Sequence, residues 1–186
     1  MRLFIAIDLS PEIRDRLAAL LDQLRPLAPL RWSPVENLHI TTKFIGEWPE
    51  AKVDNMKRAL SGVRAAPFPI TVRGLSWFPP GSFQNARRPR VLWAGIDGGD
   101  PLPHLARETD QAVAALGVPL ETRAYSPHLT LARLPDSHPL PALKETIAAL
   151  GEPEFGSFEA NVFHLYLSAQ GRYTKLADFA LADFSL

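Results

Sequence analysis

The chain has 186 residues, 46% of them hydrophobic and 22% charged, and this balance excludes an intrinsically disordered chain. Its 20 basic residues are matched by 20 acidic ones, so any contact with nucleic acid must be made by a local patch rather than by an overall positive charge. Cysteine is absent, which excludes disulfides, thiolate catalysis and cysteine-based zinc sites. We expect one domain over residues 1–186, in which two small lobes share a core.

The N-terminal apolar run ends at Asp8 and is too short for a signal peptide or a membrane span. We therefore expect a cytoplasmic protein that does not contact membranes, and a monomer.

Apolar periodicity and turn residues predict short strands mixed with amphipathic helices. Ser10 and Pro11 follow the first strand and are typical of an N-cap and a first helical position. We predict strands at 3–9, 38–45, 68–75, 90–96, 128–134, 158–168 and 173–179, a short extended piece at 31–32, helices at 11–24, 49–60, 102–116 and 140–150, and a loop at 77–89. This mixed order, in which 38–46 and 127–134 each precede a helix, predicts an α+β fold with two duplicated lobes.

Two apolar segments carry a histidine followed two positions later by a threonine. They are Leu38-His39-Ile40-Thr41-Thr42 and, nearly half the chain later, Pro127-His128-Leu129-Thr130-Leu131. Side chains alternate between the faces of a strand, so His39, Thr41 and Lys43 should share one face. His128 and Thr130 should share a face in the second strand, and strict alternation puts Arg133 on the opposite one.

Two imidazoles in one site suit general acid–base catalysis without a metal or another cofactor. One neutral imidazole takes a proton from a nucleophile, while the other, as imidazolium, protonates the leaving oxygen. Threonine hydroxyls can donate hydrogen bonds to the non-bridging oxygens of a phosphate. The pattern therefore predicts phosphodiester chemistry like that of a ribonuclease.

The two motifs resemble the duplicated His-x-Thr signature of the two-histidine (2H) phosphoesterase superfamily. Within it, the chain is most similar to the LigT-like (ThpR) RNA 2′,3′-cyclic phosphodiesterases, formerly called 2′-5′ RNA ligases. The resemblance covers nearly the whole chain and includes four further segments: the opening strand at 2–7, residues 37–46 around the first motif, a middle block at 90–95, and a closing hairpin at 165–174.

The resemblance implies a bilobal, pseudo-symmetric α+β fold, with two antiparallel sheets facing across a central cleft and helices outside. It implies hydrolysis of a terminal RNA 2′,3′-cyclic phosphate to a 2′-phosphate, with 2′-5′ ligation as the reverse reaction. By analogy, His128 would be the proton acceptor that activates water and His39 the proton donor to the departing 3′-oxygen. Thr41 and Thr130 would bind the phosphate. The implied partners are RNA 3′ ends bearing a cyclic phosphate, tRNA fragments among them.

Several other residues are candidates for substrate binding. Lys43 and Arg133 follow the two motifs and suit a phosphate, and Tyr125 and Tyr173 suit stacking on a terminal base. Arg90, with Arg87 and Arg88, forms the best local basic patch, although a solvated loop is an equal interpretation. His104, His138 and His164 lie outside the signature, and we expect surface roles for the first two and a structural role for His164.

Three alternatives stay open on the sequence. The chain could bind RNA ends or nucleotides without turnover, or it could act on a small cyclic nucleotide. A metal-dependent hydrolase is the third, but the sequence lacks the His-x-x-x-His spacing of helical metal sites and has no cysteine.

Overall fold

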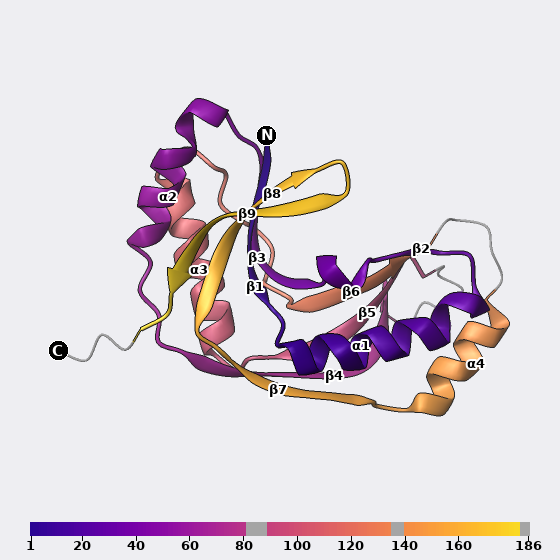
Figure 1. Ribbon diagram of the computed structural model, residues 1–186. Helices are drawn as coiled ribbons and strands as arrows, with labels where there is room; N and C mark the ends of the chain where they lie inside the picture. Colours follow the sequence, from indigo (N-terminus) through magenta and orange to yellow (C-terminus); the bar gives the residue numbers. More distant parts are fainter. Residues whose placement is uncertain (81–88, 135–139, 183–186) are drawn as a thin grey trace.

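The computed structural model describes residues 1–80, 89–134 and 140–182 (Figure 1). Arg87, Arg88 and His138 lie outside the described residues. The strands are β1 (Arg2–Asp8), β2 (Arg31–Trp32), β3 (His39–Glu47), β4 (Phe68–Phe78), β5 (Val91–Asp97), β6 (His128–Arg133), β7 (Glu154–Ala160), β8 (Val162–Ala169) and β9 (Arg172–Ala180). The α-helices are α1 (Pro11–Leu24), α2 (Val53–Ser61), α3 (Pro101–Ala114) and α4 (Pro141–Leu150), with single 3-10 turns at Arg25–Leu27, Val35–Asn37 and Glu50–Lys52.

The described strands form two antiparallel sheets, which confirms the predicted α+β class. Sheet A has the order β3-β1-β8-β9, and sheet B has the order β2-β6-β5-β4-β7. In Figure 1, α2 and α3 lie together beside sheet A, whereas α1 and α4 lie with sheet B. The helix after β1 thus joins sheet B, and the helix after β5 joins sheet A, where α3 contacts β3. Each sheet also takes strands from both halves of the chain, so the two halves are interlocked.

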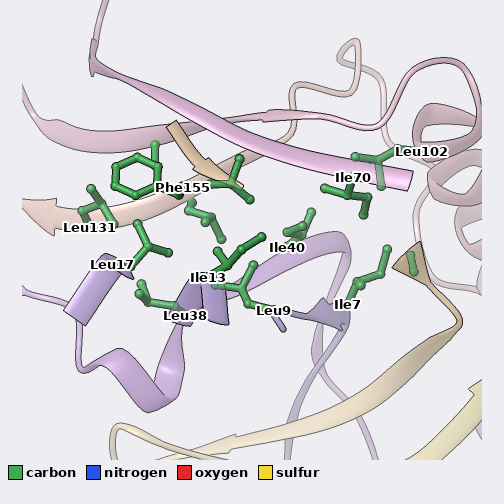
Figure 2. Packing of buried hydrophobic residues seen from close by; sticks show 14 of the residues in the cluster. Ile7, Leu9, Ile13, Leu17, Leu38, Ile40, Ile70, Leu102, Leu131 and Phe155 are labelled. Carbon is green, nitrogen blue, oxygen red and sulfur yellow. The ribbon is translucent and has the colours of Figure 1, made fainter. Parts of the chain in front are cut away.

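Helix α1 forms as its sequence predicts. The Ser10 side chain accepts a hydrogen bond from the backbone N–H of Ile13, and Pro11 occupies the first turn, where its missing N–H costs nothing. The apolar stripe of the helix is buried as predicted: Ile13, Leu17, Leu20, Leu21 and Leu24. Figure 2 shows Ile13 and Leu17 of this stripe packed among Leu38, Ile40 and Phe155, within one core that joins both sheets.

One predicted strand is wrong. The segment 158–168 is not a single strand, because the chain changes sheets at Asn161, between β7 and β8. Strand β7 pairs with β4 in sheet B, whereas β8 pairs with β1 and β9 in sheet A. The local pattern of apolar and polar residues continues through the change of sheet, since it records burial and not the identity of the neighbouring strand.

Candidate active site

The two strands that carry the His-x-Thr motifs share a β-bulge at the same position. In β3, Thr41 is opposite Ala6 and Lys43 is opposite Ile5, so Thr42 is the extra residue. In β6, Thr130 is opposite Trp93 and Ala132 is opposite Leu92, so Leu131 is the extra residue. Each bulge comes three residues after the histidine. A bulge reverses the alternation of faces for the residues that follow it.

His39 and Thr41 share one face of sheet A, which we call the histidine face of sheet A. Their partners on β1 are Asp8 and Ala6. The ring of Phe4 stacks on the His39 imidazole at a centroid distance of 4.7 Å, and the ring of Tyr173 meets it edge-on at 5.1 Å. His39 is therefore half-buried in an aromatic surrounding.

His128 and Thr130 share the corresponding face of sheet B, which we call the histidine face of sheet B. Their partners on β5 are Gly95 and Trp93, and the Trp93 ring meets the His128 ring edge-on at 6.2 Å. This imidazole is exposed. The two histidines thus have similar strand geometry but different solvent access.

Both imidazoles are oriented by the same hydrogen bond. The Nδ1 atom of His39 lies 2.6 Å from the carbonyl oxygen of Asn37, and that of His128 lies 2.8 Å from the carbonyl oxygen of Ser126. A carbonyl oxygen only accepts, so Nδ1 carries the proton in both rings. The Nε2 atom of each neutral ring is then left as a proton acceptor, and that of each protonated ring as a donor.

Strands β3 and β6 contact one another, which brings the two motifs into one region. Tyr125, three residues before His128, donates a hydrogen bond from its hydroxyl to the carbonyl oxygen of Thr41, at 2.9 Å. Burial raises the pKa of this phenol, so the hydroxyl keeps its proton. Its ring packs against the core, which corrects the prediction that Tyr125 offers a stacking surface to a base. Tyr125 connects the two motifs instead.

The prediction that Lys43 shares a face with His39 is wrong. The bulge at Thr42 turns Lys43 to the opposite face, toward α3, and only 6% of its side chain is exposed. Its Nζ atom lies 2.6 Å from Oδ1 of Asp110 and donates to the carbonyl oxygen of Pro119 at 2.7 Å. Lys43 thus has buried partners within the protein and does not face the side of the strand that carries His39.

The bulge in β6 has the opposite effect on Arg133. Strict alternation places Arg133 away from His128, but after the bulge it is opposite Val91, on the face that carries Trp93 and Thr130. Arg133 is exposed there. The equivalent position in β3, five residues after the histidine, is Phe44, whose side chain is 72% exposed. One histidine face therefore ends in a cation and the other in an aromatic ring.

The remaining candidates lie at different distances from the motifs. Tyr173 is 37% exposed and contacts His39, so it lies beside the first motif as a stacking residue should. Arg90 is exposed at the start of β5, and its carbonyl oxygen accepts a hydrogen bond from the backbone N–H of Leu134. It therefore lies at the Arg133 end of sheet B.

A polar cluster beside His39 was not predicted as part of the site. Asp8 accepts a hydrogen bond from the Tyr166 hydroxyl, and Nζ of Lys175 lies 2.7 Å from its Oδ2 atom. His164 is 4% exposed, with Nδ1 2.7 Å from Oδ1 of Asp178 and Nε2 3.7 Å from Oδ2 of Asp8. The alternation of β1, which places Phe4, Ala6 and Asp8 on one face, was the only available sequence signal.

This surrounding shifts two pKa values. Burial lowers the pKa of His39, and the Asn37 carbonyl and the charge of Asp8 offset only part of that shift. Burial alone would raise the pKa of Asp8, but the hydrogen bonds from Lys175 and Tyr166 outweigh it, so that the net shift is downward. The cluster therefore holds a negative charge near an imidazole that prefers to be neutral.

The part of the chain that the structure describes contains no cluster of side chains suited to a metal ion. Within residues 1–80, 89–134 and 140–182, no three side chains of histidine, aspartate or glutamate are placed so as to bind a metal ion together.

Comparison with protein families matches residues 7–93 and 97–173 to the family described as LigT like phosphoesterase. The chain belongs to the LigT-like phosphoesterase family. Both His-x-Thr motifs lie within the matched residues, as do Asp8, His164 and Tyr166.

Curated relatives of this LigT-like protein include two archaeal proteins named RNA 2′,3′-cyclic phosphodiesterase. The one from Aeropyrum pernix is 35% identical over 152 residues, which cover 81% of this chain and 84% of the relative. The one from Archaeoglobus fulgidus is 32% identical over 165 residues, which cover 89% of both chains.

Solved structures similar to this LigT-like chain include TT0787 of Thermus thermophilus, with a TM-score of 0.76 and 29% identity over the whole of both chains. E. coli LigT complexed with 3′-AMP has a TM-score of 0.75 and 28% identity over 98% of both chains. Among the described residues, no helix is long and apolar enough to cross a membrane.

Proposed function

We propose that this protein hydrolyses the 2′,3′-cyclic phosphate at RNA 3′ ends to a 2′-phosphate. The observation that carries the proposal is the repeated geometry of the two motifs. Each has a histidine and a threonine on one strand face, a bulge at the next position, and an Nδ1–H directed at a backbone carbonyl. The names of the relatives support the same reaction and the same class of substrate.

In the proposed reaction, water attacks the phosphorus atom and the bond from phosphorus to the 3′-oxygen breaks. His128 takes the proton of the water at Nε2, and His39 gives its Nε2 proton to the departing 3′-oxygen. Thr41 and Thr130 donate hydrogen bonds to the non-bridging oxygens, where negative charge collects. The same sequence with a 5′-hydroxyl in place of water would join that hydroxyl to the phosphate through a 2′-5′ linkage and release the 3′-oxygen, and its reversal would cleave such a linkage.

The assignment of His39 as the acid requires a protonated imidazole. Burial lowers its pKa in the free protein. A bound anionic phosphodiester would raise that pKa again, because the opposite charge favours the imidazolium. The nearby carboxylate of Asp8 acts in the same direction. His128 is exposed, which suits a base that must exchange its proton with solvent.

On the substrate side, Tyr173 would stack on the terminal base, because its exposed ring lies beside His39. Arg133 and Arg90 would contact the RNA backbone at one end of sheet B. We also propose that residues 1–186 act as one folded unit and as a monomer, in support of which strands from both halves share each sheet. RNA ends in the cytoplasm, including those of tRNA fragments, are the proposed substrates.

The test is hydrolysis of an oligoribonucleotide ending in a 2′,3′-cyclic phosphate, with excess chelator present. We expect a 2′-phosphate product, and we expect His39→Ala and His128→Ala each to lower kcat by about 10²- to 10⁴-fold. A protein that binds this RNA but leaves the phosphate cyclic would be a binding module. Activity confined to cyclic mononucleotides would place the substrate among small molecules. Full activity in both variants would refute the proposed mechanism.

A second substrate separates acid from base. Replacing the 3′-oxygen of the cyclic phosphate by sulfur gives a leaving group that needs no protonation. His39→Ala should then recover much of the lost rate, whereas His128→Ala should not. Recovery in His128→Ala alone would reverse the assignment.

A further inference from the structure

Two arginines face each other at one end of sheet B. Strand β2 pairs with the end of β6, and in this pairing Arg31 is directly opposite Arg133. Both side chains are exposed, and residues directly opposite in an antiparallel pair lie on the same face. Like charges in this arrangement destabilise a sheet. Within the described parts of the chain, neither guanidinium forms an ion pair with a carboxylate.

Hydrogen bonds from Ser33, two residues after Arg31, fix this short strand to β6. The Ser33 hydroxyl donates to the carbonyl oxygen of Thr130 at 2.7 Å, and its backbone N–H donates to the carbonyl oxygen of Leu131 at 2.8 Å. Trp32 points inward, and its Nε1–H donates to the carbonyl oxygen of Ala28 at 3.0 Å. A strand of two residues is thus fixed directly to the second motif, with a cation at its outer end.

Arg133, with Arg31 opposite it, lies two residues from Thr130 along the strand direction, counted on the neighbouring strand β5. On β5, the partner of Arg133 is Val91 and the partner of Thr130 is Trp93. Residues two apart on a strand are separated by about 7 Å. This distance is similar to that between successive phosphates of an extended RNA strand. A terminal phosphate held at Thr130 would therefore leave its upstream neighbour close to Arg133.

We propose that Arg31 and Arg133 together bind the phosphodiester one nucleotide upstream of the cyclic phosphate. This inference rests on the proposed function and narrows its substrate class to chains of at least two nucleotides. Guanidinium groups suit the role because each can offer two parallel N–H donors to one phosphate. A bound phosphate would also remove the repulsion between the two cations.

The experiment compares adenosine 2′,3′-cyclic phosphate, which has no upstream phosphodiester, with the adenosine dinucleotide that ends in a cyclic phosphate. The variant is Arg31→Gln, Arg31→Lys retains the charge, and Arg107→Gln on α3 is the control for loss of an exposed arginine. For Arg31→Gln we expect the ratio of kcat/KM for the dinucleotide to that for the mononucleotide to fall about tenfold. Arg31→Lys should restore part of that ratio, and Arg107→Gln should leave it as in the wild type.

Salt dependence provides a second measure. One lost phosphate contact should make the slope of log(kcat/KM) against log salt concentration less negative by about 0.7 for the dinucleotide. An unchanged ratio of kcat/KM in Arg31→Gln would overturn the inference, and so would an equal loss for both substrates.

Binding of the 2′-phosphorylated mononucleotide and dinucleotide, measured by calorimetry, separates this inference from the proposed function. If the wild type lacks turnover, the proposed function fails. A selective loss of dinucleotide affinity in Arg31→Gln would still support the phosphate site, and equal affinities in variant and wild type would refute it.

Discussion

The buried ion pair between Lys43 and Asp110 gives the sharpest test of the bulge in β3. Lys43→Met removes the ammonium group but keeps most of the side-chain volume. It leaves the Asp110 carboxylate, which is 14% exposed, and the carbonyl oxygen of Pro119 without this donor. Removing one partner of a buried pair costs about 3–5 kcal/mol. Asp110 still accepts from the backbone N–H of Glu121, so we expect the lower end, about 3 kcal/mol.

A loss of that size should lower Tm by about 6–12 °C in a chain of this length. Urea denaturation would give the free energy of unfolding, and Lys57→Met is the matched control, because Lys57 forms an exposed pair with Asp54. The control should cost less than about 1 kcal/mol. Asp110→Leu in the Lys43→Met background should recover most of the loss, since no buried charge is then left unpaired.

An unchanged unfolding temperature together with weaker substrate binding would show that Lys43 belongs to the active site. If Lys43→Met unfolds at the wild-type temperature but raises KM for the cyclic phosphate, Lys43 contacts substrate and the bulge does not hold it inside. Lys43 also donates a hydrogen bond to the carbonyl oxygen of Pro119, which belongs to the segment that leads to His128. Loss of the pair should therefore lower kcat as well as stability.

Three further outcomes are expected. Burial lowers the pKa of His39, so as the pH falls through about 6.5 the unfolded wild-type chain takes up a proton that the folded protein does not. The free energy of unfolding, measured by urea titration, should therefore fall less for His39→Gln than for the wild type between about pH 7.5 and 5.5. Parallel curves of unfolding free energy against pH would contradict this prediction. Tyr125→Phe should cost about 1 kcal/mol of unfolding free energy, because the hydrogen bond to Thr41 is lost, and no change would show that this bond is not formed. Phe44→Ala and Tyr173→Ala should change the free energy of unfolding by less than Tyr125→Phe, because both rings are exposed. If a ring stacks on the terminal base, its replacement by alanine should weaken RNA binding by about 1–3 kcal/mol in a calorimetric titration. Unaltered affinity in both variants would exclude both rings from the site.

Local sequence was sufficient for much of the fold. The apolar stripe of α1 and its capping residues predicted the helix and its buried face, because both depend on residues within four positions of one another. The strand at 158–168 failed for the opposite reason. Only pairing with β4 on one side of Asn161, and with β1 and β9 on the other, divides it into β7 and β8.

The two His-x-Thr motifs were visible from the sequence alone, since a repeated pattern of residue types needs no coordinates. The sequence by itself also determined that each histidine shares a strand face with its threonine. Tertiary structure decided the direction of the side chains beyond each motif. A bulge is defined by the register of a neighbouring strand, so only pairing with β1 and β5 shows that Lys43 turns inward and Arg133 outward. Long-range pairing likewise brought Arg31 opposite Arg133 and Asp8 beside His39, contacts that the spacing of residues along the chain does not contain.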